Sequence, residues 1–350
     1  MLDFSCARIT HFTAAWVGNK NRYEGFVTPK NNSIKLNDIA EEMLISTLLK
    51  PFEKTEEFFY LHHEEEVKWN LAYDSSRRIF ADPDNEIQSQ SNSLTQLLYH
   101  NCENPRVQGG EFFIAHIADL MLQGEPTNAI ALWKIQDKQD SFKSDRTTDA
   151  FDLNIINCIP SGKPQLAAII FNLDESEGYR ICAVDTVSKK DERSFWKDEF
   201  LRLRPIEDNY FNTRHHISLS SEFISQKAPI KFGLDRTGII DLLNRSGEYF
   251  KENDLFEVDD FTQKLFQETE QQEAFKEFRK QYASAYAVPL EESFDISAQA
   301  VKRDFKVFKS VLKLDKNFHI YVHGRRDLIE RGYDEQKGKK YYKVWFDNEE

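Results

Sequence analysis

Cysteine is scarce in this chain of 350 residues, and its few copies are far apart: Cys6, Cys102, Cys158 and Cys182. A disulfide framework, or a zinc site of the usual kind, needs cysteines paired at close spacing such as CxxC. No such pair occurs. We therefore expect reduced, buried thiols and no zinc site built from cysteine pairs.

Long apolar runs are also missing. No window approaches the roughly 18 apolar residues that a membrane-spanning helix requires. The N-terminal stretch does not resemble a secretory signal, because Asp3 precedes any basic residue and Arg8 and His11 interrupt the apolar segment. These absences predict a soluble cytoplasmic protein without a membrane partner.

The common catalytic and cofactor motifs are absent as well. There is no HExxH, no EF-hand loop and no GxSxG. Gly109-Gly110 lacks the lysine and the helix that follow in a phosphate-binding loop, which favours a turn before a strand. Asp82-Pro83-Asp84 is typical of a helix end and a turn rather than of a nuclease site. We expect no cofactor, no metal and no catalytic residue.

Histidine pairs come nearest to a metal site. His62-His63 precede three glutamates at 64–66, but a charged surface loop is favoured because metal ligands usually converge from separate elements. His319 and His323 would share one face of a strand, without a third ligand nearby. His215-His216 lie in the expected linker between domains.

Charge is unevenly distributed. The chain has a net charge of −13, which opposes binding to a phosphate backbone. From Lys302 to Phe346, however, there are 13 basic and six acidic residues, a net charge of +7, so that the rest of the chain carries −20. This separation matters more than the total for a charged partner.

The first half predicts a mixed unit of helices and strands. Asn37 is a helix cap followed by acids in the first turn, and Pro51 ends that helix. Two further helices are expected over 71–80 and 86–99, and a loop over the polar segment Asp140–Asp152. Apolar runs bounded by Gly, Pro or Asp predict strands over 7–17, 25–28, 111–121, 129–135, 165–173 and 179–187. In the middle of the chain these strands follow one another without helical periods, which favours an antiparallel sheet and the α+β class.

The second half is mainly helical. The segment Arg204–His216 is the candidate boundary, giving an α+β domain over 1–210 and a mainly helical domain over 211–350 that ends in a basic module at about 297–346. Apolar residues at helical spacing predict helices over Asp235–Asn253 and Asp259–Tyr286.

The basic module has the most regular pattern. Ser297 is expected to cap a helix that runs to Leu314, with an apolar stripe formed by Val301, Phe305, Phe308 and Leu312. Lysines repeat the same spacing one residue later and form a row beside this stripe. A strand over Phe318–His323, a helical turn over Arg325–Arg331, a tip over Asp334–Lys340 and a strand over Tyr341–Phe346 follow, an order that resembles a small winged module.

The cations of this module are the candidate DNA-contacting residues, because phosphate contact needs long cationic side chains on one face. They are Lys302, Lys306, Lys309, Lys313, Lys316, Arg325, Arg326, Lys339, Lys340 and Lys343. The alternative is a solvated helix flank whose lysine stems cover the apolar stripe. The aromatic residues interleaved with them are Tyr321, Tyr341, Tyr342 and Trp345. Packing in the strand core is favoured over stacking on unpaired bases, since strand alternation places half of them inward, and the other half would face outward or meet a partner.

Several segments in one order along the chain resemble the NdpA-type family of bacterial nucleoid-associated proteins, in the form found in the Bacteroidetes. They are Gly18-Asn19-Lys20, Glu24-Gly25-Phe26, Gly109-Gly110-Glu111, residues 242–246 (LLNRS), residues 249–253 (YFKEN), residues 308–324 (FKSVLKLDKNFHIYVHG), residues 332–335 (GYDE) and residues 341–344 (YYKV). The resemblance implies a cytoplasmic protein on the nucleoid that binds DNA and has no established catalytic activity. It carries over no DNA-contacting residue.

Three hypotheses follow. The first is a non-catalytic protein that contacts double-stranded DNA through its basic C-terminal module, with a symmetric homodimer doubling the phosphate contacts. The second is an acidic adaptor that reaches the nucleoid by docking on a basic DNA-binding protein. The third is a metal-dependent nuclease or hydrolase, for which His62 and His63 would be the first residues to test.

Overall fold

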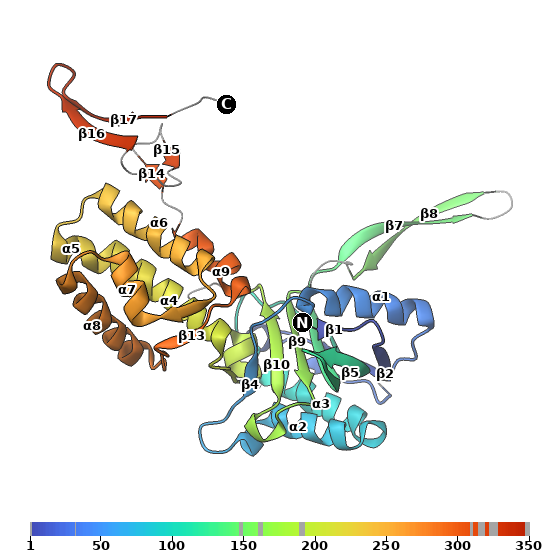
Figure 1. Ribbon diagram of the computed structural model, residues 1–350. Helices are drawn as coiled ribbons and strands as arrows, with labels where there is room; N and C mark the ends of the chain where they lie inside the picture. Colours follow the sequence, from blue (N-terminus) through green and yellow to red (C-terminus); the bar gives the residue numbers. More distant parts are fainter. Residues whose placement is uncertain are drawn as a thin grey trace. The chain divides into compact units, whose positions relative to one another are not determined.

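Two compact units, Met1–Ile206 and Glu207–Glu350, make up the chain in a computed structural model (Figure 1). The structure describes residues 2–31, 33–146, 150–159, 164–188, 193–308, 311–313, 319–321 and 328–346. Among these residues, no helix has the length and apolar character needed to cross a bilayer. Both units combine helices with antiparallel strand pairs, which confirms the predicted α+β class.

An antiparallel sheet of nine described strands forms the centre of unit 1, in the order β11-β4-β10-β9-β6-β5-β2-β3, with β1 paired to the end of β5. Gln123 and Gly124 connect β5 and β6, and both have positive φ angles, 54° and 90°, as in the tight turns that match strand twist. Most of these strands lie where the sequence predicts them. Their bounds are β1 Leu2–Asp3, β2 Arg8–Val17, β3 Phe26–Val27, β4 Phe59–Leu61, β5 Gly110–Leu122, β6 Glu125–Ile135, β9 Leu166–Phe171, β10 Arg180–Asp185 and β11 Leu203–Pro205.

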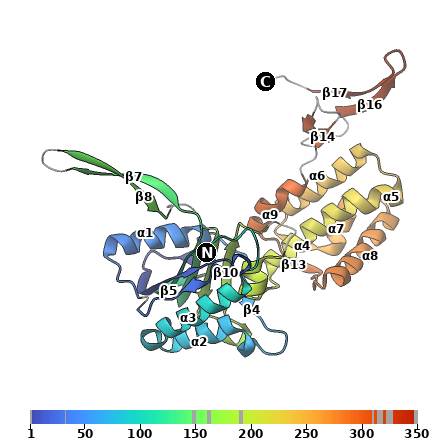
Figure 2. The ribbon, with the colours of Figure 1, turned by 180° about the vertical axis from the view of Figure 1, so that it is seen from behind.

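Both faces of this sheet are covered. Ile130 and Leu132 of β6 pack with one hydrophobic cluster, to which helices α2 and α3 contribute, whereas Ala131 and Trp133 pack with a second cluster near α1. Figure 2 shows α2 and α3 on one side of the sheet and α1 on the other. Coverage on two sides explains why β9 is a continuous apolar run whose six residues are all buried.

The helices of unit 1 begin at polar caps. The Asn37 side chain accepts a hydrogen bond from the Ala40 amide at 2.8 Å, as predicted. Asp82 ends α2 and caps α3, with Pro83 at the first position of α3. The helices are α1 Asp38–Leu49, α2 Leu71–Ala81 and α3 Pro83–Asn101, with 3-10 turns at Lys20–Arg22, Lys50–Phe52, Val67–Trp69 and Glu175–Glu177 and a π-helical segment at Phe195–Phe200.

A two-stranded hairpin replaces the loop predicted over Asp140–Asp152. Its strands β7 (Gln139–Arg146) and β8 (Phe151–Cys158) pair antiparallel with each other, and the structure describes no other strand beside them. The loop prediction was wrong because β7 is almost entirely polar, so that its sequence shows none of the alternation that marks a half-buried strand.

Unit 2 is a helical bundle around an aromatic core. Phe250, Phe256 and Phe261 lie with ring centroids 5.3–5.6 Å apart, and all three are buried. The elements are α4 Asn209–Glu222, a π-helical segment Phe223–Lys227, α5 Ala228–Phe232, α6 Arg236–Glu252, α7 Val258–Leu265, α8 Thr269–Tyr286 and α9 Ala298–Asp304, with a small sheet of β12 Leu255–Glu257 and β13 Ser293–Asp295.

Two expectations for unit 2 need correction. The helix predicted over Asp259–Tyr286 is two helices, because Phe266 leaves α7 in an extended conformation and buries its ring in the core. The segment expected as a linker up to His216 is already helical from Asn209, and His216 is fully buried. Tertiary packing determines both the break at Phe266 and the burial of His216, and helical periodicity in the sequence does not predict either.

Candidate nucleic-acid interface

The start of the basic module forms as predicted. Ser297 caps α9 by accepting a hydrogen bond from the Ala300 amide at 3.2 Å. Val301 and Phe308 of the apolar stripe are buried. Lys302 of α9 and Lys306, in the 3-10 turn Phe305–Phe308, are exposed beside this stripe. These two lysines are therefore accessible to a binding partner, as the candidate DNA-contacting surface requires.

The single helix over 297–314 is wrong. Helix α9 ends at Asp304, the 3-10 turn ends at Phe308, and residues 311–313 form strand β14 (Val311–Lys313), paired with β15 (His319–Tyr321). The lysine row is broken because Phe308 turns into the core beside Gly247 and Phe250, and Val311-Leu312 pair as a strand. Lys313 lies on β14, while Lys309, Lys316, Arg325 and Arg326 lie outside the described residues.

A second hairpin closes the described chain. Strand β16 (Ile329–Asp334) pairs with β17 (Lys339–Val344), so the helical turn predicted over Arg325–Arg331 is wrong for residues 329–331. The tip is a turn in which a carboxylate oxygen of Asp334 accepts hydrogen bonds from the amides of Gln336 and Lys337, both at 3.0 Å. Gly338 supplies the positive φ, 62°, that returns the chain.

The register of this hairpin separates its lysines. Side chains alternate along a strand, so Lys339, Tyr341 and Lys343 share one face and lie across from Asp334, Gly332 and Glu330. On that face the Lys343 ammonium is 3.9 Å from the Glu330 carboxylate and 4.1 Å from the centre of the Trp345 ring.

Lys340 occupies the opposite face. It pairs in register with Tyr333, and Tyr342 and Val344 follow on the same face of β17. Lys340, Tyr333 and Val344 are exposed and Tyr342 is half-buried. The two hairpin acids on β16 are on the other face, so Lys340 presents its charge beside tyrosines rather than beside carboxylates.

The aromatic residues of the module differ in exposure. Tyr341 and Trp345 are 44% and 52% exposed and Tyr333 is 60% exposed, whereas Tyr342 is half-buried. Exposed rings beside cations are a surface on which bases or sugars can stack. The side chain of Tyr321 lies outside the described residues.

The histidines considered for a hydrolytic site line a cleft in unit 1. His62, His63 and Glu64 border it together with His100 and Glu103 near α3, and the cleft volume is about 590 Å³. Burial first, and then the positive charge of Arg204, lower the pKa of His62. Within the part of the chain that the structure describes, no three His, Cys, Asp or Glu side chains are arranged to hold a metal ion.

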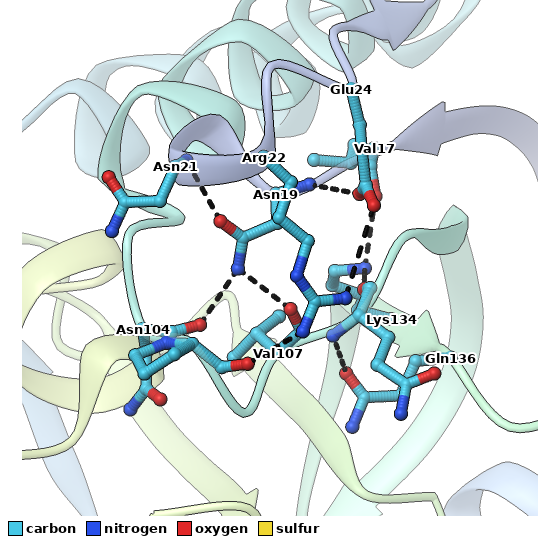
Figure 3. A network of polar contacts seen from close by, with 11 residues as sticks. Val17, Asn19, Asn21, Arg22, Glu24, Asn104, Val107, Lys134 and Gln136 are labelled. Atoms are coloured by element: carbon cyan, nitrogen blue, oxygen red, sulfur yellow. Dashed lines mark hydrogen bonds and ion pairs between the residues drawn. The ribbon is translucent and has the colours of Figure 1, made fainter.

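A polar network missed by sequence reasoning connects two of the segments that resemble the family, through Asn19 and Glu24 (Figure 3). The side-chain amide of Asn19 donates to the carbonyl oxygens of Asn104 and Val107, both at 2.8 Å, and the backbone N–H of Asn19 donates to the Glu24 carboxylate at 2.7 Å. Lys134, fully buried on β6, donates to the carbonyl oxygens of Val17 and Gln108 at 3.1 and 2.7 Å.

This network is structural in character. Burial lowers the pKa of Lys134 to about 8. The side chain is buried and its ammonium is bonded to backbone oxygens, so it ties the end of β2 at Val17 and the segment at Gln108 to β6. Nothing in the sequence around Lys134 predicts that it is buried and bonded to backbone oxygens.

The chain thus combines an α+β unit, a helical unit and a basic, aromatic hairpin. A family model described as nucleoid-associated protein YejK matches residues 18–340. The chain belongs to this family, which confirms the resemblance seen in the sequence. No curated protein gives a significant match.

Proposed function

We propose that this protein is a non-catalytic, nucleoid-associated DNA-binding protein of the bacterial cytoplasm, which contacts duplex DNA through the phosphate-neutralising cations of its C-terminal basic module. Membership of a nucleoid-associated family supports the nucleoid role. The observation that carries the DNA contact is the +7 charge between Lys302 and Phe346 in a chain that is otherwise acidic.

The arrangement of the module supports this proposal. Lys302 and Lys306 are exposed beside a buried stripe, and Lys339, Lys340 and Lys343 are exposed on a hairpin. Non-specific DNA binding rests mainly on the release of counterions from neutralised phosphates. Exposed Lys302 and Lys306, which lie beside the buried residues Val301 and Phe308, meet this requirement without any base-specific contact.

The test is a binding titration of purified full-length protein on random duplex DNA, followed by fluorescence anisotropy across a salt series. We expect the logarithm of the association constant to fall linearly with the logarithm of salt concentration, by about 0.9 for each phosphate contacted. Replacement of Lys302, Lys306, Lys339, Lys340 and Lys343 by glutamine should lower both the affinity and this slope.

The matched control replaces five exposed lysines of unit 1, Lys35, Lys50, Lys54, Lys68 and Lys143, by glutamine. The net charge changes equally, so a site-specific effect must exceed that of the control. Absence of binding at low salt would overturn direct contact. It would favour the second candidate function, an adaptor whose remaining −20 charge docks on a basic nucleoid protein.

A further inference from the structure

The hairpin β7–β8 of unit 1 is amphipathic, although it is exposed to solvent. By register and alternation, Phe142, Phe151, Leu153 and Ile155 lie on one face. The opposite face carries Ser141, Lys143, Asp145, Asp152 and Asn154, with Ile156 among them. A two-stranded ribbon with one apolar face is normally covered by a further layer.

This apolar face has no cover in the described chain. Phe142, Phe151, Leu153 and Ile155 are 74%, 76%, 67% and 68% exposed. Together they present about 500 Å² of apolar surface, since a large unburied side chain carries roughly 150–250 Å². A contiguous patch of this size marks an interaction site.

The occupant is indicated by charge. The apolar row on β7 has Asp140 at one end and Arg146 at the other, both exposed and on the apolar face. Their separation is about 20 Å along the strand. When two copies of this face meet antiparallel, each Asp140 lies opposite the partner's Arg146, and each bulky Phe142 lies opposite a small Ser144. A parallel arrangement would instead place like charges together.

We infer that β7–β8 is the homodimerisation arm of this protein, in which two hairpins pack their apolar faces antiparallel about a twofold axis. Two such faces would bury about 1,000 Å², which is near the minimum area of a biological interface. Duplex DNA is a poorer occupant, because the acids Asp140, Asp145 and Asp152 outnumber the cations Lys143 and Arg146 on the hairpin. A twofold dimer would present two basic modules on one assembly.

The decisive comparison uses neighbouring isoleucines on opposite faces. Ile155→Thr removes apolar surface from the proposed interface, whereas Ile156→Thr makes the same change on the polar face. Sedimentation equilibrium of the full chain without DNA should show a dimer for the wild type. Because a twofold interface contains each residue twice, Ile155→Thr should raise the dimer dissociation constant by about 100-fold. Ile156→Thr should leave it within threefold.

Charge exchange tests the antiparallel orientation. Asp140→Arg alone and Arg146→Asp alone place like charges at both ends, and each should weaken the dimer roughly tenfold. The double variant Asp140→Arg/Arg146→Asp should restore wild-type dimerisation. A monomeric wild type, or equal effects of the two isoleucine variants, would overturn the arm. Failure of the double variant to restore the dimer would overturn the orientation. None of these outcomes depends on whether the protein binds DNA.

Discussion

Glu330 and Lys343 lie opposite each other in the C-terminal hairpin, with the ammonium 3.9 Å from the carboxylate. Three residues earlier on the same strand, Lys340 points to the other face and pairs with Tyr333 instead. These two lysines of the same strand therefore differ in the charge of the residues that surround them. In the proposed contact, Lys343 would meet DNA as half of an ion pair, and Lys340 would meet it as a cation beside aromatic rings.

This difference predicts unequal effects on DNA binding. Lys340→Gln should reduce the salt slope by about 0.9, the value for one lost phosphate contact. Lys343→Gln should reduce it by less than half as much, because Glu330 already neutralises that ammonium. Both changes remove one charge from one strand, so each is the control for the other. Equal slopes in anisotropy titrations would contradict a one-sided contact surface.

The extent to which sequence predicts this structure depends on whether a signal is local. Asn37 predicts its helix correctly because capping is an interaction with the amide three residues later. The apolar run in β9 predicts a strand because burial on both faces leaves no polar position. By contrast, Phe308 has helical spacing but turns into a core made by distant residues, and no local pattern reports that.

The candidate site shows the same limit. The charge separation and the resemblance are visible in the sequence, and they identify the basic module. The pairing of Glu330 with Lys343 depends on the register of the hairpin. The alternation of polar and apolar residues along a strand does not specify this register when both kinds of residue occupy both faces. Lys134 is missed for another reason: its partners are backbone oxygens, which carry no side-chain signature.

Lys134 should make the stability of unit 1 depend on alkaline pH. Its pKa is lowered from 10.5 to about 8 by burial. Between these values the unfolded chain binds more protons than the folded one, so the free energy of unfolding rises with pH. A difference of this size corresponds to about 3 kcal/mol.

The measurement compares wild type with Lys134→Met in urea unfolding from pH 7 to 10.5, followed by the fluorescence of buried Trp133 and Trp196. Wild type should gain about 3 kcal/mol relative to the variant over this range. The exposed-site control Lys35→Met should follow wild type. The nearby Cys102, whose pKa burial raises to about 11, is common to all three proteins. Parallel curves for wild type and Lys134→Met would refute the lowered pKa.

His216 should give unit 2 an acid sensitivity. Its Nδ1 lies 2.9 Å from the Asn212 carbonyl oxygen, which can only accept, and the Arg279 guanidinium donates to its Nε2 at 3.4 Å. The ring is therefore neutral with the proton on Nδ1. Burial lowers the pKa of His216 to about 3.

Between pH 6.5 and 3, His216 is protonated in the unfolded chain but not in the folded protein. The free energy of unfolding therefore falls as the pH falls, by up to about 4 kcal/mol. His216→Gln removes this dependence. Hydrogen exchange of α4 peptides should show wild type losing protection below pH 6.5 more steeply than the variant. His100→Gln, an exposed change in unit 1, serves as control. The same slope in His216→Gln and wild type would show that the imidazole is not buried neutral.

Gly110 tests whether the Gly109-Gly110-Glu111 segment serves packing or binding. A Cβ at Gly110 would lie 2.0 Å from the Ile135 carbonyl oxygen and 2.8 Å from the Gln136 Cα, and neither backbone atom can rotate away. Gly110→Ala must push β5 from β6 at the end where Lys134 is bonded. We expect a loss of roughly 3 kcal/mol in unit 1 stability. Gly124→Ala, where a Cβ meets open space and only the φ of 90° is strained, should cost about 1 kcal/mol.

Because Gly110 is needed for close contact between strands, DNA affinity measured well below the unfolding temperature should be unchanged in both variants. A Gly110→Ala protein of normal stability that has lost DNA binding would instead assign this segment to the binding surface.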